Sequence, residues 1–356
     1  MCIYLGETAD NSIKSEEHIF PACIGGIKKL SNNEVSADAN KIFMKLENAF
    51  AHRSEIQLSR GFYGPGKRGK DKKNESSIVM LYDKNNQGEL GYMYMGKAYT
   101  IPQILIHRET NTFTFTSMEK EEAKAKATAQ NFFNDIAKFN ILEDKFMHIY
   151  MDRNDASPDF IIGIADKKII IASHTARENL DKAFINNYIK KLMGAVIGET
   201  ESKTITNPHV VMPFELSDDI NRVFAKIAFN SLCYLKGADF VNSKEFDDFR
   251  KWIITGEGSS ENWIDENIAP HIETTITFPK NSHWCIFTVS NKKVCAVVCL
   301  YEHWTRKYII GDLPENETLP LIGYICDYQN HVEYTLSEYI YNIAKNNHKL
   351  LEGNNE

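Results

Sequence analysis

A carboxylate and an imidazole stand side by side near the start of the chain, at Glu17 and His18, and an amide follows at Asn40. A neutral imidazole, with an unperturbed pKa of about 6.5, can take a proton from water near neutral pH. Carboxylate and amide oxygens are hard donors that suit Mg²⁺ or Mn²⁺. A divalent ion beside a phosphate neutralises the charge that develops as a phosphodiester bond breaks. These residue types therefore suit metal-assisted phosphodiester hydrolysis.

The residues around these positions form a pattern. It reads C-I-Y-L-G from Cys2, E-H-I-F-P from Glu17, G-G from Gly25 and S-A-D-A-N from Ser36. This pattern resembles the HNH (ββα-metal) endonuclease family, in the branch with C-x-x-C-G, then EH-x-x-P with Gly-Gly, then C-x-x-C-N. The resemblance implies an α+β chain whose small N-terminal ββα-metal module cuts nucleic acid with the help of a metal ion.

The resemblance also implies a role for each site residue. His18 would be the general base, and Glu17 and Asn40 would hold Mg²⁺ or Mn²⁺. Asn33, or Asn32 if the loop register differs, would hold the base or the loop. The residues alone leave other interpretations open, because Glu17 and His18 could be an exposed loop pair and Asn40 could cap a helix.

The cysteines that hold a structural zinc in that branch are mostly replaced. Their positions correspond to Cys2, Leu5, Ser36 and Ala39, so a single thiol remains. A structural zinc needs four sulfur or nitrogen ligands, and we therefore expect none here. Packing has to stabilise the module instead, with Leu5 and Ala39 filling the centre of the former site.

A basic tract follows the module. Segment 53–73 holds seven Lys or Arg residues against Glu55 and Asp71. Such a tract favours nucleic-acid binding, because each contact between a basic side chain and a phosphate releases a counterion. The alternative is a solvated loop. The residues expected to contact nucleic acid are Arg53, Arg60, Lys67, Arg68 and Lys70.

The spacing of apolar residues predicts the elements that position these groups. It predicts a short helix after Asn40 and further helices over about 120–138, 175–193, 218–235 and 244–254. Thr116-x-x-Glu119 and Thr175-x-x-Glu178 are candidate capping boxes for two of them. Alternating apolar residues between turn signals predict strands within 77–96, 146–151, 160–174 and 283–304.

These elements suggest three parts. Residues 1–55 are the expected HNH-like module, residues 56–76 a basic loop or linker, and residues 77–356 an α+β region of mixed hairpins and helices. A division near residue 200 would split that region into two subdomains. Cys295 and Cys299, with His283 and His303 nearby, are expected to be core residues of a hairpin rather than a second metal site.

The composition is that of a globular protein, with 43% hydrophobic and 25% charged residues. No apolar run approaches the roughly 18 residues of a membrane span, and the N-terminus is polar almost at once, so we expect no membrane association and a cytoplasmic location. The formal charge of −7 argues weakly against a chain coated with nucleic acid along its length. Seven cysteines without a disulfide spacing favour reduced thiols.

We therefore expect a metal-dependent endonuclease, with DNA favoured over RNA. The C-terminal region would select the substrate, a protein partner or a second copy of the chain. The alternative, from a different class, is a catalytically inactive HNH-derived module that binds nucleic acid or another protein.

Overall fold

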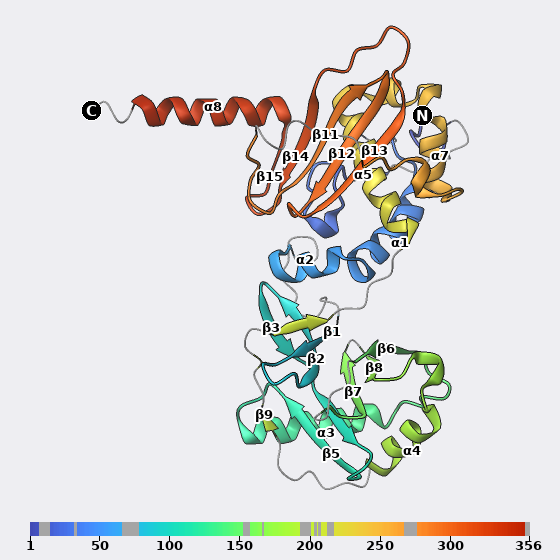
Figure 1. Cartoon of the computed structure of the whole chain (residues 1–356), viewed down its shortest axis with the longest axis vertical. Helices are drawn as coiled ribbons and strands as arrows, with labels where there is room; N and C mark the ends of the chain where they lie inside the picture. Colours follow the sequence, from blue (N-terminus) through green and yellow to red (C-terminus); the bar gives the residue numbers. More distant parts are fainter. Residues whose placement is uncertain are drawn as a thin grey trace. The chain divides into compact units, whose positions relative to one another are not determined.

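The computed structural model (Figure 1) describes residues 1–6, 15–31, 34–65, 78–151, 157–165, 167–192, 201–202, 205, 208–211, 217–266 and 276–352. Helices and sheets both contribute, so the chain is α+β, as its sequence predicts. The chain divides into two compact units: unit 1 comprises Met1–Lys72 with Glu215–Glu356, and unit 2 comprises Lys73–Phe214. Unit 2 is thus an insertion in the sequence of unit 1. Among the described residues, no helix has both the length and the apolar character needed to cross a membrane.

This division differs from the one expected from the sequence. Residues 1–55 do not form a unit alone, because their buried side chains share one hydrophobic core with residues beyond 217. Residues Ile56–Tyr63, expected in a loop, form helix α2. Ile56 is buried and Arg60 donates hydrogen bonds to the backbone carbonyls of Cys23 and Ala51, and these contacts stabilise a helix despite its glycine. The boundary expected near residue 200 lies between residues 214 and 215.

Helix α5 (Asp218–Lys236) is the centre of unit 1. It contacts helix α1 (Ala37–Arg53) as well as an antiparallel sheet with the strand order β13-β12-β11-β14-β15. Most of α5 is buried, because it has neighbours on several sides. The remaining elements of unit 1 are η1 (Ala22–Ile24), α6 (Ala238–Val241), η5 (Lys244–Phe246), α7 (Asp247–Thr255), η6 (Ser260–Asn262), β11 (His283–Ser290), β12 (Lys293–Leu300), β13 (Trp304–Asp312), β14 (Ile322–Asp327), β15 (Val332–Thr335) and α8 (Leu336–Glu352).

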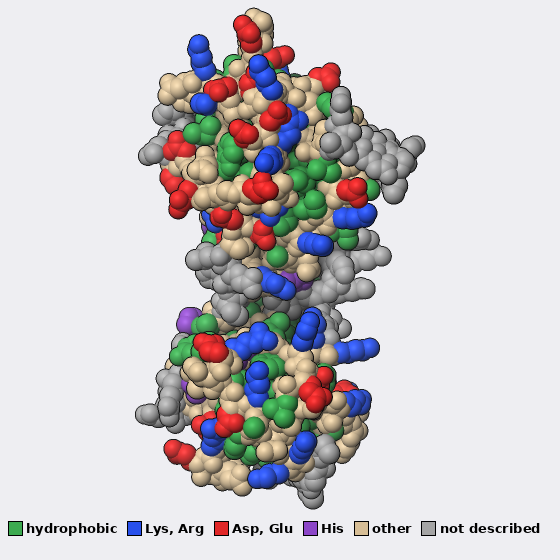
Figure 2. All heavy atoms as spheres, turned by 90° about the vertical axis from the view of Figure 1, so that its right-hand side faces the viewer, with side chains coloured by type: hydrophobic (Ala, Val, Ile, Leu, Met, Phe, Trp, Pro, Cys, Tyr) green, Lys and Arg blue, Asp and Glu red, His purple; other side chains and the backbone are tan. Residues whose placement is uncertain are grey.

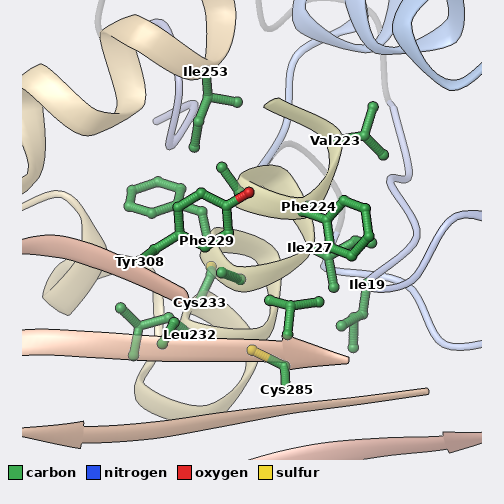
Figure 3. Packing of buried hydrophobic residues seen from close by; sticks show 14 of the residues in the cluster. Ile19, Val223, Phe224, Ile227, Phe229, Leu232, Cys233, Ile253, Cys285 and Tyr308 are labelled. Atoms are coloured by element: carbon green, nitrogen blue, oxygen red, sulfur yellow. The ribbon is translucent and has the colours of Figure 1, made fainter. Parts of the chain in front are cut away.

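Successive residues of β11 face opposite sides of this sheet, as the period of two in a strand requires. Cys285 belongs to the large core around α5, whereas Trp284 belongs to a smaller cluster that includes Leu336 at the start of α8. Figure 3 shows Ile19, from the N-terminal segment, and Cys285 among the side chains of α5. The N-terminal segment therefore depends on α5 for its core.

Unit 2 has three layers. A sheet in the order β10-β1-β2-β3 packs on one face of a mixed sheet in the order β6-β8-β7-β4-β5-β9, and helices α3 and α4 cover the other face. Strands β7 and β8 are buried on both faces, which explains their continuous apolar runs. The elements are β1 (Val79–Tyr82), β2 (Gly88–Tyr94), β3 (Lys97–Thr100), β4 (Gln103–His107), β5 (Thr112–Ser117), α3 (Glu122–Ile136), β6 (Phe146–Tyr150), β7 (Phe160–Ala165), β8 (Lys168–Ser173), η4 (Arg177–Asn179), α4 (Lys182–Leu192), β9 (Glu201–Ser202) and β10 (His209–Val211).

Most predicted elements are confirmed, but the two capping boxes are wrong. Thr116 lies in β5, where it pairs with Gln103 of β4, so its backbone belongs to a sheet rather than to a helix start. Helix α4 begins at Lys182, because the short helix η4 and a turn intervene after Thr175. The hairpins β1–β2, β7–β8 and β11–β12 form as predicted.

Candidate functional site

The segment that carries Glu17 forms one arm of a short antiparallel hairpin. The N–H of Ile19 donates to the carbonyl of Lys28 at 3.0 Å, and the N–H of Leu30 donates to the carbonyl of Glu17 at 2.8 Å. His18 and Lys29 form the bridge between the two arms. Helix α1 follows, so the local order is two extended arms and then a helix.

Two glycines allow the hairpin to turn. Gly25 adopts a left-handed conformation with φ of 95°, which favours glycine. At Gly26 a Cβ would lie 1.8 Å from the carbonyl oxygen of Phe20, so no side chain fits there. The Gly-Gly pair therefore has a structural reason in the folding of this hairpin.

The positions that hold zinc in the HNH pattern lie together. The N–H of Ser36 donates to the Sγ atom of Cys2 at 3.3 Å, and the N–H of Gly6 donates to the Cys2 carbonyl at 2.8 Å. Leu5 packs against the core of unit 1, and Ala39 is fully buried within it. Apolar packing thus occupies the positions of Leu5 and Ala39, while Ser36 is buried next to Cys2.

Glu17 points into the protein and is only 5% exposed. Its Oε1 atom accepts a hydrogen bond from the Nζ atom of Lys226 at 2.5 Å, and Lys226 also donates to Glu47 of α1. Lys226 lies on α5, is fully buried, and has its ammonium 5.0 Å from the centre of the Phe43 ring. We call Glu17, Glu47 and Lys226 the charged cluster.

Burial and charge act against each other in this cluster. Burial alone would lower the pKa of Lys226, but contacts with Glu17 and Glu47 outweigh it and raise the pKa, so the amine is charged. Burial raises the pKa of Glu17; the Lys226 ammonium opposes this rise and Glu47 adds to it. Two carboxylates and one ammonium give a formal charge of −2 + 1 = −1 when all three are ionised.

Helix α5 also fixes the backbone of His18. The Nδ2 atom of Asn230 donates to the His18 carbonyl at 2.9 Å, and the hydroxyl of Tyr4 donates to the Oδ1 atom of Asn230 at 2.7 Å. Lys226 and Asn230 are four residues apart and share a face of α5. The same helix face therefore holds Glu17 by its side chain and His18 by its main chain.

The imidazole of His18 is partly exposed. Burial lowers its pKa below the usual value, and the positive charges of Lys29 and Lys226 lower it further. The ring is therefore neutral near neutral pH, which is the form that accepts a proton. Within the described part of the chain, no hydrogen bond engages the His18 ring nitrogens.

Asn40 lies in the first turn of α1 but does not cap it. Ser36 is the cap, since its side-chain oxygen accepts from the N–H of Ala39 at 3.3 Å. The Nδ2 atom of Asn40 donates to the hydroxyl of Ser15 at 3.0 Å, two residues before Glu17. Asn40 is also two helical turns from Glu47, on the same face of α1. The structure thus brings Asn40 to the segment that carries Glu17, while Asn33 and Asn32 lie outside the described residues.

The basic residues divide into two kinds. The Nε and Nη1 atoms of Arg60 donate to the Cys23 and Ala51 carbonyls at 2.8 and 2.7 Å, so its guanidinium is engaged in structural contacts. Arg53 is exposed at the end of α1. Figure 2 shows Lys and Arg side chains intermingled with Asp and Glu on the face that it presents. Three of the residues predicted to bind nucleic acid lie outside the described residues: Lys67, Arg68 and Lys70.

The donor set fits a hard divalent ion in its chemistry. Mg²⁺ keeps several waters in proteins, so one or two carboxylates and an amide oxygen suffice as protein ligands. Glu17 and Asn40 offer such oxygens, and the charged cluster has a net charge of −1 when its three members are ionised. The described residues contain no group of three or more His, Cys, Asp and Glu side chains arranged for a metal. The Lys226 ammonium already donates to the Oε1 atom of Glu17, so an ion at this oxygen would have to share it with the ammonium or displace the ammonium.

His283 is a core residue, as expected. It is fully buried, its Nε2 atom lies 2.9 Å from the Ile24 carbonyl, and its Nδ1 atom accepts from the N–H of Tyr301 at 3.1 Å. These partners specify the neutral tautomer with hydrogen on Nε2. Cys295 and Cys299 are buried in the smaller cluster of the sheet.

No family model, curated protein or solved structure gave a significant match to this chain. The site residues that the sequence analysis missed are Glu47, Lys226 and Asn230. Two signals point to them: Lys226 and Asn230 are polar residues four apart within the apolar stretch of α5, and Glu47 follows Asn40 by two helical turns.

Proposed function

We propose that unit 1 hydrolyses phosphodiester bonds of nucleic acid, with His18 as the general base. The supporting observation is the placement of His18: its ring is neutral and partly exposed, while α5 fixes its backbone and the carboxylate next to it. A base held in this way can take a proton from a water molecule that attacks a phosphate. The resemblance to HNH nucleases supports DNA rather than RNA as the substrate.

Glu17 and Asn40 would hold the divalent ion, which when bound stabilises negative charge at the scissile phosphate. The residues of the chain have separate tasks beside it. Asn230 orients the main chain of His18, Lys226 fixes Glu17, and Ser15 fixes the amide of Asn40. Among the five residues predicted to contact nucleic acid, Arg53 is the described one that is exposed at the surface and could contact a phosphate.

The test uses the full-length protein with plasmid DNA, single-stranded DNA and RNA, each with Mg²⁺, Mn²⁺, Ni²⁺ or EDTA. We expect cleavage with a divalent ion and none with EDTA. General-base catalysis contributes about 10²–10⁴-fold, so His18→Ala should lower the cleavage rate at least ~100-fold while DNA affinity stays within ~2-fold. His52→Ala, which changes an exposed histidine at the end of α1, is the matched control. A wild-type protein that cuts none of these substrates would rule out the proposal.

A second candidate is a non-catalytic HNH-derived module that binds nucleic acid or a protein. The observation that favours it is the ammonium of Lys226, which provides the carboxylate of Glu17 with a cation from the chain itself. Under this alternative, wild-type protein neither binds Mn²⁺ nor cuts. Charge reversal at Arg53, Lys67 and Arg68 would then weaken nucleic-acid binding, whereas His18→Ala would change nothing.

A further inference from the structure

Lys226 differs from Lys29, a lysine of the hairpin itself. Lys29 forms a surface pair with Glu16 at 2.5 Å, in which the two side chains are 40% and 51% exposed. Lys226 contacts Glu17 over the same 2.5 Å, but it is fully buried and bonds to a second carboxylate as well. Water and salt screen the surface pair, whereas the buried charges act on each other with little screening.

We propose that Lys226 is an internal cation of the candidate site, which competes with a divalent ion for the carboxylate of Glu17 and so keeps ion binding weak. This inference rests on the proposed function, because it concerns the same ion. It assigns to Lys226 the tuning of metal affinity, a role distinct from contact with substrate, since a fully buried side chain is out of reach of a polymer.

The geometry gives two reasons for competition. First, the Lys226 Nζ atom lies 2.5 Å from the Oε1 atom of Glu17. An ion bound to that oxygen at about 2.1 Å would therefore be at most about 4.6 Å from Nζ. Two cations at that separation repel each other strongly where water is scarce. Second, the ammonium already neutralises half of the charge of the two carboxylates, which reduces the attraction for an added ion.

The test measures Mn²⁺ binding to the full-length protein by calorimetry, without nucleic acid. Lys226→Met keeps an unbranched side chain, one atom shorter than that of lysine, and removes its charge. We expect this variant to bind Mn²⁺ at least ~10-fold more tightly than wild type, which corresponds to about 1.4 kcal/mol. Lys29→Met removes an exposed lysine of the same hairpin and should leave the affinity within ~2-fold.

Thermal unfolding in EDTA and in Mn²⁺ gives a second readout. Without the ammonium, the buried Glu17 and the half-buried Glu47 lose their common cation. Lys226→Met should therefore be less stable in EDTA than wild type, and Mn²⁺ should raise its Tm by more than it raises that of wild type. If Lys226→Met does not fold in either condition, Lys226→Gln, which keeps a hydrogen-bond donor, replaces it. Its Mn²⁺ affinity and its Tm shift are then compared with those of wild type. A folded variant that binds Mn²⁺ no more tightly than wild type overturns the inference.

The two proposals fail in different ways. If wild type cuts DNA with Mn²⁺ and neither Lys226 variant gains affinity, the nuclease stands and the internal-cation role does not. If the variants gain affinity but no form of the protein cuts nucleic acid, the role of Lys226 stands and the nuclease does not.

Discussion

Two groups of positions in unit 1 align with metal positions of the HNH-like sequence pattern, and they are buried in opposite ways. Where that pattern has zinc cysteines, Leu5 and Ala39 pack in the apolar core and the N–H of Ser36 donates to the Sγ atom of Cys2. In the charged cluster, the carboxylate of Glu17 contacts Lys226, a cation from within the fold. A thiol resembles a small apolar side chain, so an apolar residue can take its place in a core at a small cost in stability. A buried carboxylate without a cation costs several kcal/mol, so it has to retain a partner.

Introducing cysteines at these positions would sharpen this comparison most. Leu5→Cys, Ser36→Cys and Ala39→Cys, combined with the native Cys2, should create a four-cysteine site, because these positions already lie together. Structural zinc binding can contribute ~10 kcal/mol, so the Tm of the triple variant should rise steeply with Zn²⁺. The matched control carries serine at the same three positions. Equal responses of the two variants to Zn²⁺ would show that these four positions do not have the geometry of a zinc site.

Breaking the charged cluster should have the next largest effect. Lys226→Ala leaves the buried carboxylate of Glu17 and the half-buried carboxylate of Glu47 without a cation, and we expect it to lower the free energy of unfolding by ~3–5 kcal/mol. Replacing all three members with apolar residues (Glu17→Leu, Glu47→Leu and Lys226→Met) should recover much of that loss, since well-packed apolar side chains can substitute for a buried ion group. Urea denaturation in EDTA measures the loss of stability in Lys226→Ala and its recovery in the triple variant. A triple variant as unstable as Lys226→Ala would contradict this account of the cluster.

His283 is buried in a third way, as a neutral ring without a counter-charge. Burial lowers its pKa from 6.5 to about 3, so the unfolded chain binds a proton between these values and the folded chain does not. Its contribution to stability is complete above pH 6.5 and is lost as the pH falls toward 3. Between pH 6.5 and 4.5 the expected loss is ~2–3 kcal/mol.

His283→Gln isolates this effect, because glutamine offers a donor and an acceptor but does not titrate in this range. Its stability, measured by denaturation at each pH, should fall less steeply than that of wild type between pH 6.5 and 4.5. Parallel curves for the two proteins would mean that other groups account for the acid sensitivity.

The smallest effect concerns two arginines of the basic tract. Arg60→Met removes charge-assisted hydrogen bonds to two carbonyls and should cost ~2 kcal/mol of stability. Arg53→Met changes an exposed residue and should stay within ~0.5 kcal/mol. Salt-dependent DNA binding should show the reverse order, with the larger loss at Arg53. If Arg60→Met loses DNA affinity without losing stability, Arg60 contacts DNA and its structural role is minor.

Local patterns were enough to predict most elements, including the helix around Ile220, Val223 and Ile227. They did not reveal which segments meet. Lys226 pairs with Glu17 across 209 residues, and apolar periodicity carries no information on contacts so distant in sequence. The same limit explains why the local pattern suggests a separate module over residues 1–55, although their buried side chains share a core with α5. Arg60 is a related example: its charge suggests a phosphate contact, whereas its Nε and Nη1 atoms donate to carbonyl oxygens within the protein.

Because unit 2 is inserted in the sequence of unit 1, the two units fold in a set order while the protein is being synthesised. The ribosome releases residues 1–72 long before α5 exists, and the partners of Tyr4 and Glu17 lie 226 and 209 residues downstream. Lys73–Phe214 can fold as soon as it emerges, while the first segment waits for its core. A nascent or truncated chain would therefore lack an assembled candidate site, so any cutting activity would arise only after most of the polypeptide has been made.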